Sequence, residues 1–371
     1  RSRGLGDVYK RQFTNSAEFG IISQRDFFDH DIAKMSSLGG YYIVRSEDFV
    51  YNPRISTSAP VGPINRNKLG RIGVMSPLYT VFRPHDIGTT YLEHFFKSKY
   101  WHSFMNFNGD SGARSDRFSI KDSVFFEMPI PIPHIEEQRK IGEYLTHLDR
   151  LITLHQRKYD KLTNMKKSML EKMFPKNGAN VPEIRFKGFT DAWEQRKLGE
   201  AVQEVTRNDA TSDAPIMMIT ANNGFIEQSE RYAFNNAGES LKKYILLEKG
   251  ELAYNHGASK LRPYGSCFTL TTSENARIPF VYHCFSADEQ NSEFLSIELN
   301  GADVENQLRR IVSSGARMDG LLNISFQEYV SVSVLLPTIE EQNKIADFFK
   351  NLDNLITLHQ RELEKLKNLK K

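Results

Sequence analysis

The sequence is poor in cysteine and has no long apolar run. Its only cysteines are Cys267 and Cys284, and no Cys or His residues lie beside them at metal-ligand spacing. The sequence therefore indicates neither a disulfide framework nor a zinc site, and a reducing compartment fits this composition. It has no stretch of about 18 apolar residues and no charged-then-apolar leader, which argues against membrane insertion and secretion. We expect a cytoplasmic protein with no membrane partner.

The sequence also lacks the common catalytic signatures. The Gly-x-x-x-x-Gly-Lys-Ser/Thr loop of many ATPases is absent. The nearest approach to the Asn/Asp-Pro-Pro-aromatic motif of adenine methyltransferases is Asn52-Pro53-Arg54-Ile55, which lacks the second proline and the aromatic residue. We therefore expect a chain that performs no chemistry, binds no cofactor and holds no metal.

The total charge says little about partners, because 49 basic residues nearly balance 46 acidic ones and leave a net charge of +3. The distribution is more informative, since local patches attract phosphates. Two stretches, 156–172 and 361–371, are rich in Lys and Arg. Solvated helix faces would explain each stretch taken alone.

An internal repeat organises the chain. Residues 133–167 match 337–371 without a gap at an offset of 204, and 21 of the 35 positions are identical. The upstream blocks match more weakly, at an offset of 203, through short motifs such as Ser-Gly-Ala-Arg. Each half is thus a variable block followed by a nearly constant one.

The constant blocks have the heptad spacing of paired helices. The first apolar seam consists of Ile141, Leu145, Leu148, Ile152, His155, Tyr159 and Leu162, and it continues to Met169 with Lys166 as its only interruption. The second seam repeats the first and consists of Ile345, Phe349, Leu352, Ile356, His359, Leu363 and Leu366. At about 1.5 Å per residue the first helix would span roughly 50 to 60 Å. We expect the two helices to pair with each other. For His155 and His359, a role in helix register is favoured over metal binding or proton transfer.

The variable blocks read as mixed α/β. Strand character is expected at 41–44, 78–82, 244–247, 251–254, 266–270 and 280–285, and a short helix at 303–312. Strand order cannot be derived from these patterns.

The chain resembles the specificity subunit of type I restriction-modification enzymes. Two features carry the resemblance: the duplicated Pro-x-Ile-Glu-Glu-Gln-x-Lys-Ile motif at 133–141 and 337–345, and the segment Pro182-Glu183-Ile184-Arg185-Phe186 followed by Trp193. The resemblance implies an α+β fold with two mixed α/β target-recognition domains, separated by two long antiparallel coiled-coil helices in a pseudo-two-fold internal repeat. It implies a non-catalytic subunit that reads a bipartite, non-palindromic site in double-stranded DNA. It also implies a scaffold for two methyltransferase subunits, which restriction/motor subunits can join.

The resemblance also divides the chain. Residues 1–12 match nothing in the pattern and are interpreted as a leader that is not native. The expected parts are then a first recognition domain (13–132), a first long helix (133–174), a linker (175–198), a second recognition domain (199–336) and a second long helix (337–371). Family members have a segment like 181–198 before the first recognition domain too, so we interpret the chain as truncated at its N-terminus.

The best DNA-reading candidate is the loop 255–264, which follows the expected strand 251–254, and the matching region of the first half is 52–71. Asn can pair with adenine, and Arg or Lys with guanine or phosphate. The candidates are Tyr51, Asn52, Arg54, Arg66, Lys68 and Arg71 in the first half, and Tyr254, Asn255, His256, Lys260, Arg262 and Tyr264 in the second. An ordinary polar loop is the alternative. Arg114 and Arg317, each after Ser-Gly-Ala, are equally well explained as structural residues or as phosphate contacts.

Two classes of function remain at this point. The first is DNA recognition by a non-enzymatic scaffold. The second is a structural coiled-coil adaptor whose globular domains bind protein. The salt dependence of DNA binding distinguishes them, because affinity that rests on phosphate contacts falls steeply with salt.

Overall fold

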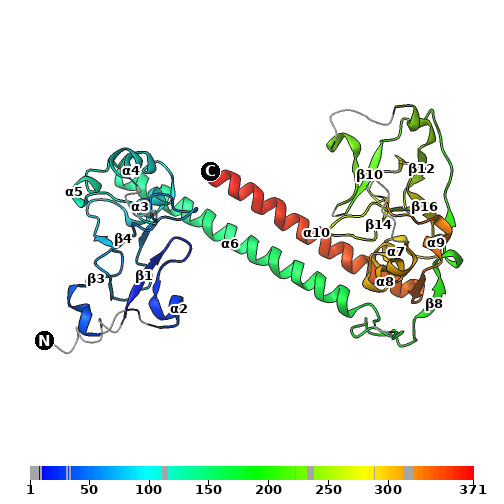
Figure 1. Cartoon of the computed structure of the whole chain (residues 1–371), viewed down its shortest axis with the longest axis horizontal. Coiled ribbons are helices and arrows are strands. Elements are labelled where there is room, and N and C mark those ends of the chain that lie inside the picture. The colour runs from blue at the N-terminus through cyan, green and yellow to red at the C-terminus, as the bar shows by residue number, and fades with distance from the viewer. Residues whose placement is uncertain are drawn as a thin grey trace. The chain divides into compact units, whose positions relative to one another are not determined.

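The computed structural model describes residues 8, 11–30, 32, 35–110, 116–176, 178–221, 223–231, 238–287, 289–312 and 321–371. These residues form two compact units. Unit 1 contains the described residues up to Leu154 together with Glu364–Lys371, and unit 2 is His155–Leu363. Each unit contains a globular α/β block and parts of the two long helices, α6 and α10, drawn in green and red (Figure 1). The predicted fold class, with mixed α/β blocks and two long helices, is confirmed.

Unit 1 is built from short antiparallel strands covered by short helices. Strand β4 is the centre of a three-stranded sheet of order β5-β4-β7, while β1 pairs with β2 and β3 with β6. The elements are β1 (Phe13–Ser16), β2 (Gly20–Ser23), α2 (Gln24–Phe28), the 3₁₀ helix η1 (Met35–Gly40), β3 (Tyr42–Val44), β4 (Phe49–Tyr51), β5 (Ile64–Arg66), β6 (Gly73–Met75), β7 (Thr80–Phe82), α3 (Thr89–Lys97), α4 (His102–Asn108), α5 (Asp122–Phe125) and α6 (Ile135–Lys172).

Unit 2 repeats this plan and adds three strands, β8, β9 and β17. Its main sheet has the order β14-β13-β16-β9, and the pairs β10–β11, β12–β15 and β17–β8 accompany it. The elements are β8 (Glu194–Lys197), η2 (Leu198–Glu200), β9 (Gln203–Glu204), β10 (Met217–Thr220), β11 (Gly224–Glu227), η3 (Gln228–Glu230), η4 (Gly238–Lys243), β12 (Ile245–Glu248), β13 (Leu252–Asn255), β14 (Ser266–Thr269), β15 (Asn275–Ile278), β16 (His283–Ser286), α7 (Ser292–Leu299), α8 (Ala302–Ile311), α9 (Phe326–Val330), β17 (Ser333–Leu336) and α10 (Ile339–Lys370).

The strands of unit 1 have counterparts in unit 2 at offsets of about 203 residues, for example β4 with β13 and β7 with β16. The strands predicted in the variable blocks correspond to β3, β7, β12, β13, β14 and β16, and the predicted short helix to α8. The domain boundaries predicted from the sequence stay predictions.

Helices α6 and α10 run antiparallel where they pair. In unit 2, His155 Nδ1 lies 3.1 Å from His359 Nδ1, and Lys166 Nζ lies 2.6 Å from Asp353 Oδ1. The residue numbers rise along one helix as they fall along the other, which defines the direction. In unit 1, Lys370 forms an ion pair with Asp149. Lys370 and Asp149 are the repeat equivalents of Lys166 and Asp353, 204 residues apart in sequence, so the same ion pair occurs twice.

The predicted seam residues are all buried or half-buried, whereas most residues between them are exposed. Both helices begin with two glutamates in the first turn and end with lysine in the last turn, which suits the helix dipole. The Lys166 position, which interrupts the apolar seam, is explained by the ion pair with Asp353.

A glutamine anchors the start of each long helix to its globular block. Gln138 Oε1 accepts a hydrogen bond from the backbone N–H of Gly88 (2.8 Å), and its Nε2 donates to the carbonyl of Pro133 (2.7 Å). Gln342 makes the equivalent bonds with Asn291 and Pro337. Each such bond contributes about 1 kcal/mol to stability. The repeated Glu-Glu-Gln motif thus has a structural purpose in both units.

Among the described residues, none of the helices combines the length and the apolar character that a membrane crossing requires.

Candidate nucleic-acid interface

A buried tyrosine supports the candidate loop in each unit. The hydroxyl of Tyr51, at the end of β4, donates to the carbonyl of Val61 (2.9 Å), and that of Tyr254, in β13, donates to the carbonyl of Tyr264 (2.6 Å). Burial raises the pKa of both phenols, so they remain donors at neutral pH. The geometry therefore favours a role in shaping the loops over contact with DNA.

The asparagine that follows each tyrosine is also engaged in the fold. Asn52 Nδ2 donates to the carbonyl of Asn15 (2.7 Å), and Asn255 Nδ2 donates to the carbonyl of Ile219 (3.0 Å). The side-chain oxygens accept from the backbone N–H two residues on, at Arg54 and Gly257. Both amides therefore hold the start of a loop.

A glycine closes each loop, and the sequence analysis missed it. Gly62 and Gly265 have φ of 81° and 82°, a region that favours glycine. A Cβ would lie 2.1 Å from the carbonyl oxygen of Asn52 at Gly62, and 2.6 Å from that of Asn255 at Gly265. The offset of 203 between the two glycines is the signal that could have identified them.

The candidate residues within the loop of unit 2 divide into buried and free. His256 is buried, with its ring nitrogens 2.8 Å and 2.6 Å from the carbonyl oxygens of Leu322 and Val281. Arg262 is half-buried and donates through Nη1 to the carbonyl of Asn300 (2.9 Å). Lys260 is exposed, with no ion-pair partner among the described residues. Lys260 is thus the most available cation of this loop.

In unit 1, an acidic residue engages two of the predicted cations. Glu93, whose side chain is 9% exposed, forms ion pairs with Arg66, Lys68 and Lys97. Burial alone would raise the pKa of the Glu93 carboxyl, but these three cations outweigh it and lower the pKa to about 2. Arg66 and Lys68 therefore stabilise the attachment of β5 and the residues after it to α3.

Two other predicted cations of unit 1 are exposed. Arg54 has no ion-pair partner among the described residues, and the guanidinium of Arg71 lies 5.9 Å from the centre of the Phe13 ring. These two are available to phosphates.

The structure joins each loop to the chain that follows the Ser-Gly-Ala-Arg motif. In unit 1, the N–H of Phe118 donates to the carbonyl of Pro53 (2.7 Å), and Arg54 and Arg117 form a β-bridge. In unit 2, the N–H of Leu322 donates to the carbonyl of His256 (2.8 Å). Arg114 and Arg317 themselves lie outside the described residues. The loops and the chain after the motif, far apart in sequence, form one surface in each unit.

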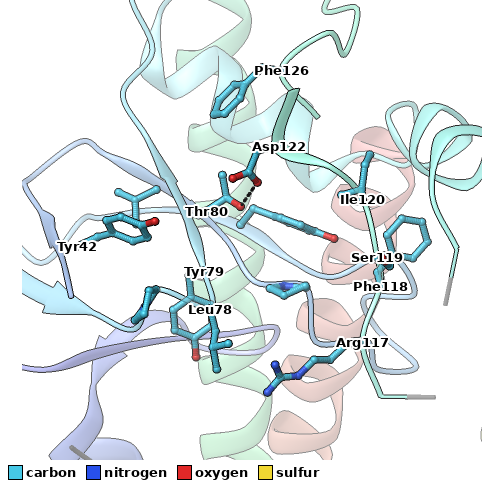
Figure 2. A pocket seen from close by; sticks show the side chains of 14 residues that line it. Tyr42, Leu78, Tyr79, Thr80, Arg117, Phe118, Ser119, Ile120, Asp122 and Phe126 are labelled. Atoms are coloured by element: carbon cyan, nitrogen blue, oxygen red, sulfur yellow. Dashed lines mark hydrogen bonds between the residues drawn. The ribbon is translucent and has the colours of Figure 1, made fainter. Parts of the chain in front are cut away.

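A hollow of about 570 Å³ lies beside the loop of unit 1. Figure 2 shows its lining, in which the hydroxyl of Thr80 donates to Asp122 Oδ1 (3.2 Å) and Arg117 lies at one edge. The unit 2 counterparts of Pro53 and Thr80 are the larger His256 and His283, whose rings stack at 5.2 Å. In unit 2, two larger rings thus stand where unit 1 has Pro53 and Thr80 at the hollow.

The described residues contain no group of three or more His, Cys, Asp or Glu side chains placed to hold a metal ion. Cys267 and Cys284 are free and buried, and burial raises the pKa of the Cys267 thiol to about 12. Two exposed arginines at the end of α8, Arg309 and Arg310, were not among the sequence candidates.

Comparison with known proteins connects this architecture to one family. The family model for the type I restriction modification DNA specificity domain matches residues 31–164 and 191–368. Two curated relatives come from Methanocaldococcus jannaschii. The MjaVIII specificity subunit is 24% identical over 275 residues, which cover 68% of this chain and 61% of that protein. The putative MjaX specificity subunit is 22% identical over 272 residues, 68% of this chain and 59% of that protein. The chain therefore spans about three fifths of the length of these relatives.

Two solved structures are also similar. The HsdS subunit from Thermoanaerobacter tengcongensis matches with a TM-score of 0.41 and 16% identity, covering 88% of this chain and 79% of that one. A type I restriction-modification S subunit from M. genitalium matches with a TM-score of 0.47 and 12% identity, covering 88% and 81%. Because the family model spans both repeats, the chain belongs to the type I restriction-modification DNA specificity family.

Proposed function

We propose that the chain reads a bipartite, non-palindromic site in double-stranded DNA, one half with each globular block, and performs no chemistry of its own. The observation that carries this proposal is the repeated loop frame. Both units repeat the buried tyrosine, the asparagine and the closing glycine, while the residues between them differ. Conserved supporting residues around loops that differ in sequence suit two domains that recognise two different DNA sequences.

The charges of the loops support contact with phosphate and base edges. Arg54 and Arg71 in unit 1, and Lys260 in unit 2, are exposed cations on or beside the loops. Arg and Lys can contact either phosphate oxygens or guanine edges. The residues held in the frame, such as Tyr51 and Tyr254, would act by positioning these side chains.

Methylation and cleavage would belong to partner subunits, for which the long helices offer a repeated binding surface. Leu154 in α6 is 46% exposed, and its repeat equivalent Leu358 in α10 is 52% exposed. Both lie in an identical stretch of seven residues, 151–157 and 355–361. An apolar residue presented twice in the same sequence context fits two copies of one partner, and we propose methyltransferase subunits. Restriction/motor subunits would join through that complex.

A salt series tests the DNA reading. For duplexes that contain the methylated site of the source genome, we expect the logarithm of the binding affinity to fall linearly with the logarithm of the salt concentration. The preference for these duplexes over unrelated ones should persist. The measurement is fluorescence anisotropy of labelled duplexes at several salt concentrations. Weak, salt-independent binding without sequence preference would favour the coiled-coil adaptor.

Leucine substitutions test the scaffold. Leu154→Glu and Leu358→Glu should each remove one methyltransferase from the complex, and the double variant should remove both. Light scattering after size exclusion gives the mass of each complex. Exposed Thr153→Glu is the matched control. Full assembly of the double variant would contradict this use of the helices.

A further inference from the structure

A cavity of about 600 Å³ lies within unit 2. It is lined by β14, α7 and the first residues of α8, together with the end of α6 and the first half of α10. A cavity of this size is in the range of sites that enclose a small molecule. The chemistry of its lining indicates what kind of molecule could fill it.

The internal repeat relates this cavity to an ionic network of unit 1. In that network Glu93 on α3 forms ion pairs with three cations, which are Arg66, Lys68 and Lys97. The four equivalent positions of unit 2, 203 residues later, carry shorter side chains and all line the cavity; they are Ser296, Thr269, Thr271 and Asn300. Unit 2 thus has short polar residues beside a cavity where unit 1 has long charged ones.

The fold itself satisfies the short polar residues. Thr269 Oγ1 donates to the carbonyl of Ser292 (2.7 Å), and Ser296 Oγ donates to the carbonyl of Cys267 (3.1 Å). Asn300 Nδ2 donates to the carbonyl oxygens of Cys267 and Ser296. These groups therefore require no partner from a ligand.

An apolar set of side chains forms another part of the lining. It comes from α6 and the residues after it, from β14, from α7 and from α10, and its main members are Leu170, Phe174, Phe268, Ile297 and Phe349. The rings of Phe174 and Phe349 lie 6.2 Å apart. A ligand that fills the cavity would bury apolar surface, and aromatic rings suit such surroundings.

Most of the charged groups in the lining need no ligand. Two lysines form ion pairs within it, Lys166 with Asp353 and Lys350 with Glu293. Water can solvate three others, which are exposed: Glu171, Lys176 and Asp303. The two that remain, Arg262 and Glu298, are half-buried and buried respectively.

Glu298 can lose its charge without a ligand. Its Oε1 accepts a hydrogen bond from the backbone N–H of Leu335 (3.2 Å). Burial raises the pKa of the Glu298 carboxyl to about 7. At neutral pH this carboxyl is therefore protonated in a large share of the molecules, which removes the cost of burying a charge.

Arg262 cannot lose its charge in this way, because a guanidinium stays protonated in proteins. Its Nη1 donates to the carbonyl of Asn300 (2.9 Å), but its Nε is buried without a hydrogen-bond partner. Within the part of the chain that the structure describes, Arg262 forms no ion pair, and burial lowers its pKa by more than the Glu305 carboxylate raises it. An anion in the cavity would supply the missing charge.

We infer that this cavity is a binding site for a small organic anion, in which a carboxylate pairs with Arg262 and an aromatic body packs against Phe268, Ile297 and Phe349. A carboxylate is the expected group because its two oxygens match the planar fork of a guanidinium. The inference does not depend on the proposed reading of DNA, because binding is measured on the free chain. Either proposal can therefore fail without the other.

Three soluble ligands of similar size and different charge test the chemical class: benzoate, benzamide and benzylammonium. Each is titrated against the full chain without DNA, and saturation-transfer NMR measures binding. We expect benzoate to bind with a dissociation constant on the order of 1 mM, as is usual for so small a ligand. It should bind about tenfold more tightly than benzamide, which lacks the charge.

The other outcomes of this comparison would overturn the inference. These are the absence of saturable benzoate binding, and equal affinity for benzoate and benzamide. Tighter binding of benzylammonium would make the cavity a site for cations beside Glu298, and would overturn it as well.

Substitution of the arginine locates the anion. Arg262→Gln should weaken benzoate binding about tenfold and leave benzamide binding unchanged, because only the charged pair is lost. Arg309→Gln, the same exchange at an exposed arginine of α8, is the matched control and should change neither affinity. Benzoate binding that survives Arg262→Gln undiminished would overturn the inference.

A second variant fills the cavity with the side chains of unit 1. Thr269→Arg combined with Ser296→Glu introduces the equivalent of the Arg66–Glu93 ion pair. This variant should bind none of the three ligands while its circular dichroism spectrum stays that of the unchanged chain. Normal benzoate affinity in the folded double variant would place the ligand elsewhere and overturn the inference. If the double variant does not fold, Arg262→Gln decides the question.

Discussion

Lys260 and Arg262 lie in one loop, but the structure gives them different surroundings. Lys260 is exposed, while Arg262 is half-buried and bonded to the carbonyl of Asn300. Burial lowers the pKa of the Arg262 guanidinium. The first residue is therefore free to contact DNA, and the second also supports the fold.

We expect Lys260→Ala to weaken DNA binding, by about 1 to 3 kcal/mol where the side chain reads a base, without changing stability. Arg262→Ala should in addition lower the free energy of unfolding by about 1 kcal/mol, because a hydrogen bond to the backbone is lost. Anisotropy titrations and urea denaturation measure the two quantities. Lys249→Ala, which removes an exposed lysine paired with Glu274, is the control. Unchanged binding by both loop variants would remove this loop from the interface.

The candidate residues show what a repeated motif can and cannot predict. Tyr51 and Asn52 recur as Tyr254 and Asn255, and the sequence correctly marked these positions as equivalent. It could not distinguish a residue that frames the loop from one that contacts DNA, because both tasks use polar and aromatic side chains. Burial decides between them, and burial depends on strands that are distant in sequence.

At the level of elements, the long helices were the most predictable part. Their heptad spacing is a local property, so the seam from Ile141 to Leu162 could be identified without tertiary information. The ion pair between Lys166 and Asp353 could not be predicted, because Asp353 is distant in sequence and its position opposite Lys166 depends on the register of the two helices. For the same reason, the order of the short strands was not derivable.

We expect the His155–His359 contact to contribute to the acid sensitivity of the helix pair. Burial, together with His155 and Lys158, lowers the pKa of His359 below its ordinary value. A base with a lowered pKa resists protonation in the folded state, so its stabilising contribution is present above the unfolded value, about 6.5, and is lost as pH falls below it. We therefore expect the melting temperature to fall between pH 7 and pH 5.

Replacing both histidines tests whether they cause this dependence of the melting temperature on pH. His155→Leu with His359→Leu should raise stability by about 1 to 3 kcal/mol, since half-buried leucines replace polar groups in the seam. The double variant should also reduce the pH dependence, to which His94, His102 and His283 still contribute because burial lowers their pKa values too. Circular dichroism melts at pH 5, 6, 7 and 8 give both results. The exposed His147→Gln variant should retain the wild-type pH profile. A double leucine variant with unchanged acid sensitivity would assign the effect to other groups.

At the scale of the whole molecule, the distance between the two halves of the proposed bipartite site should depend on the length of the two long helices. Removing Gln156–Leu162 from α6 and Leu352–Leu358 from α10 deletes one facing heptad from each helix and keeps the seam in phase. The loss of about 10 Å of helix corresponds to about three base pairs. We expect the preferred spacer to shorten by about that amount, or binding to be abolished, with the half-site sequences unchanged.

Duplexes that differ only in spacer length provide the measurement, with binding by the chain alone as the readout. A variant lacking the heptad in α6 only is the comparison, because its helices no longer match in register. An unchanged spacer preference in the double deletion, or a continuous palindromic site in the methylation pattern of the intact complex, would contradict the two-reader mechanism.

The helix contacts also have a consequence for inheritance. The internal repeat makes His155 and His359 equivalent, and it makes the Lys166–Asp353 ion pair equivalent to the Lys370–Asp149 ion pair. Each repeat thus carries a self-complementary surface, and half of the gene would suffice to encode a symmetric dimer. Recombination within the stretches that encode the helical repeats would replace one globular block, which we propose reads half of the DNA site, and leave the helix pair intact. A lineage could then acquire a new DNA specificity in a single genetic event, without an intermediate that fails to assemble.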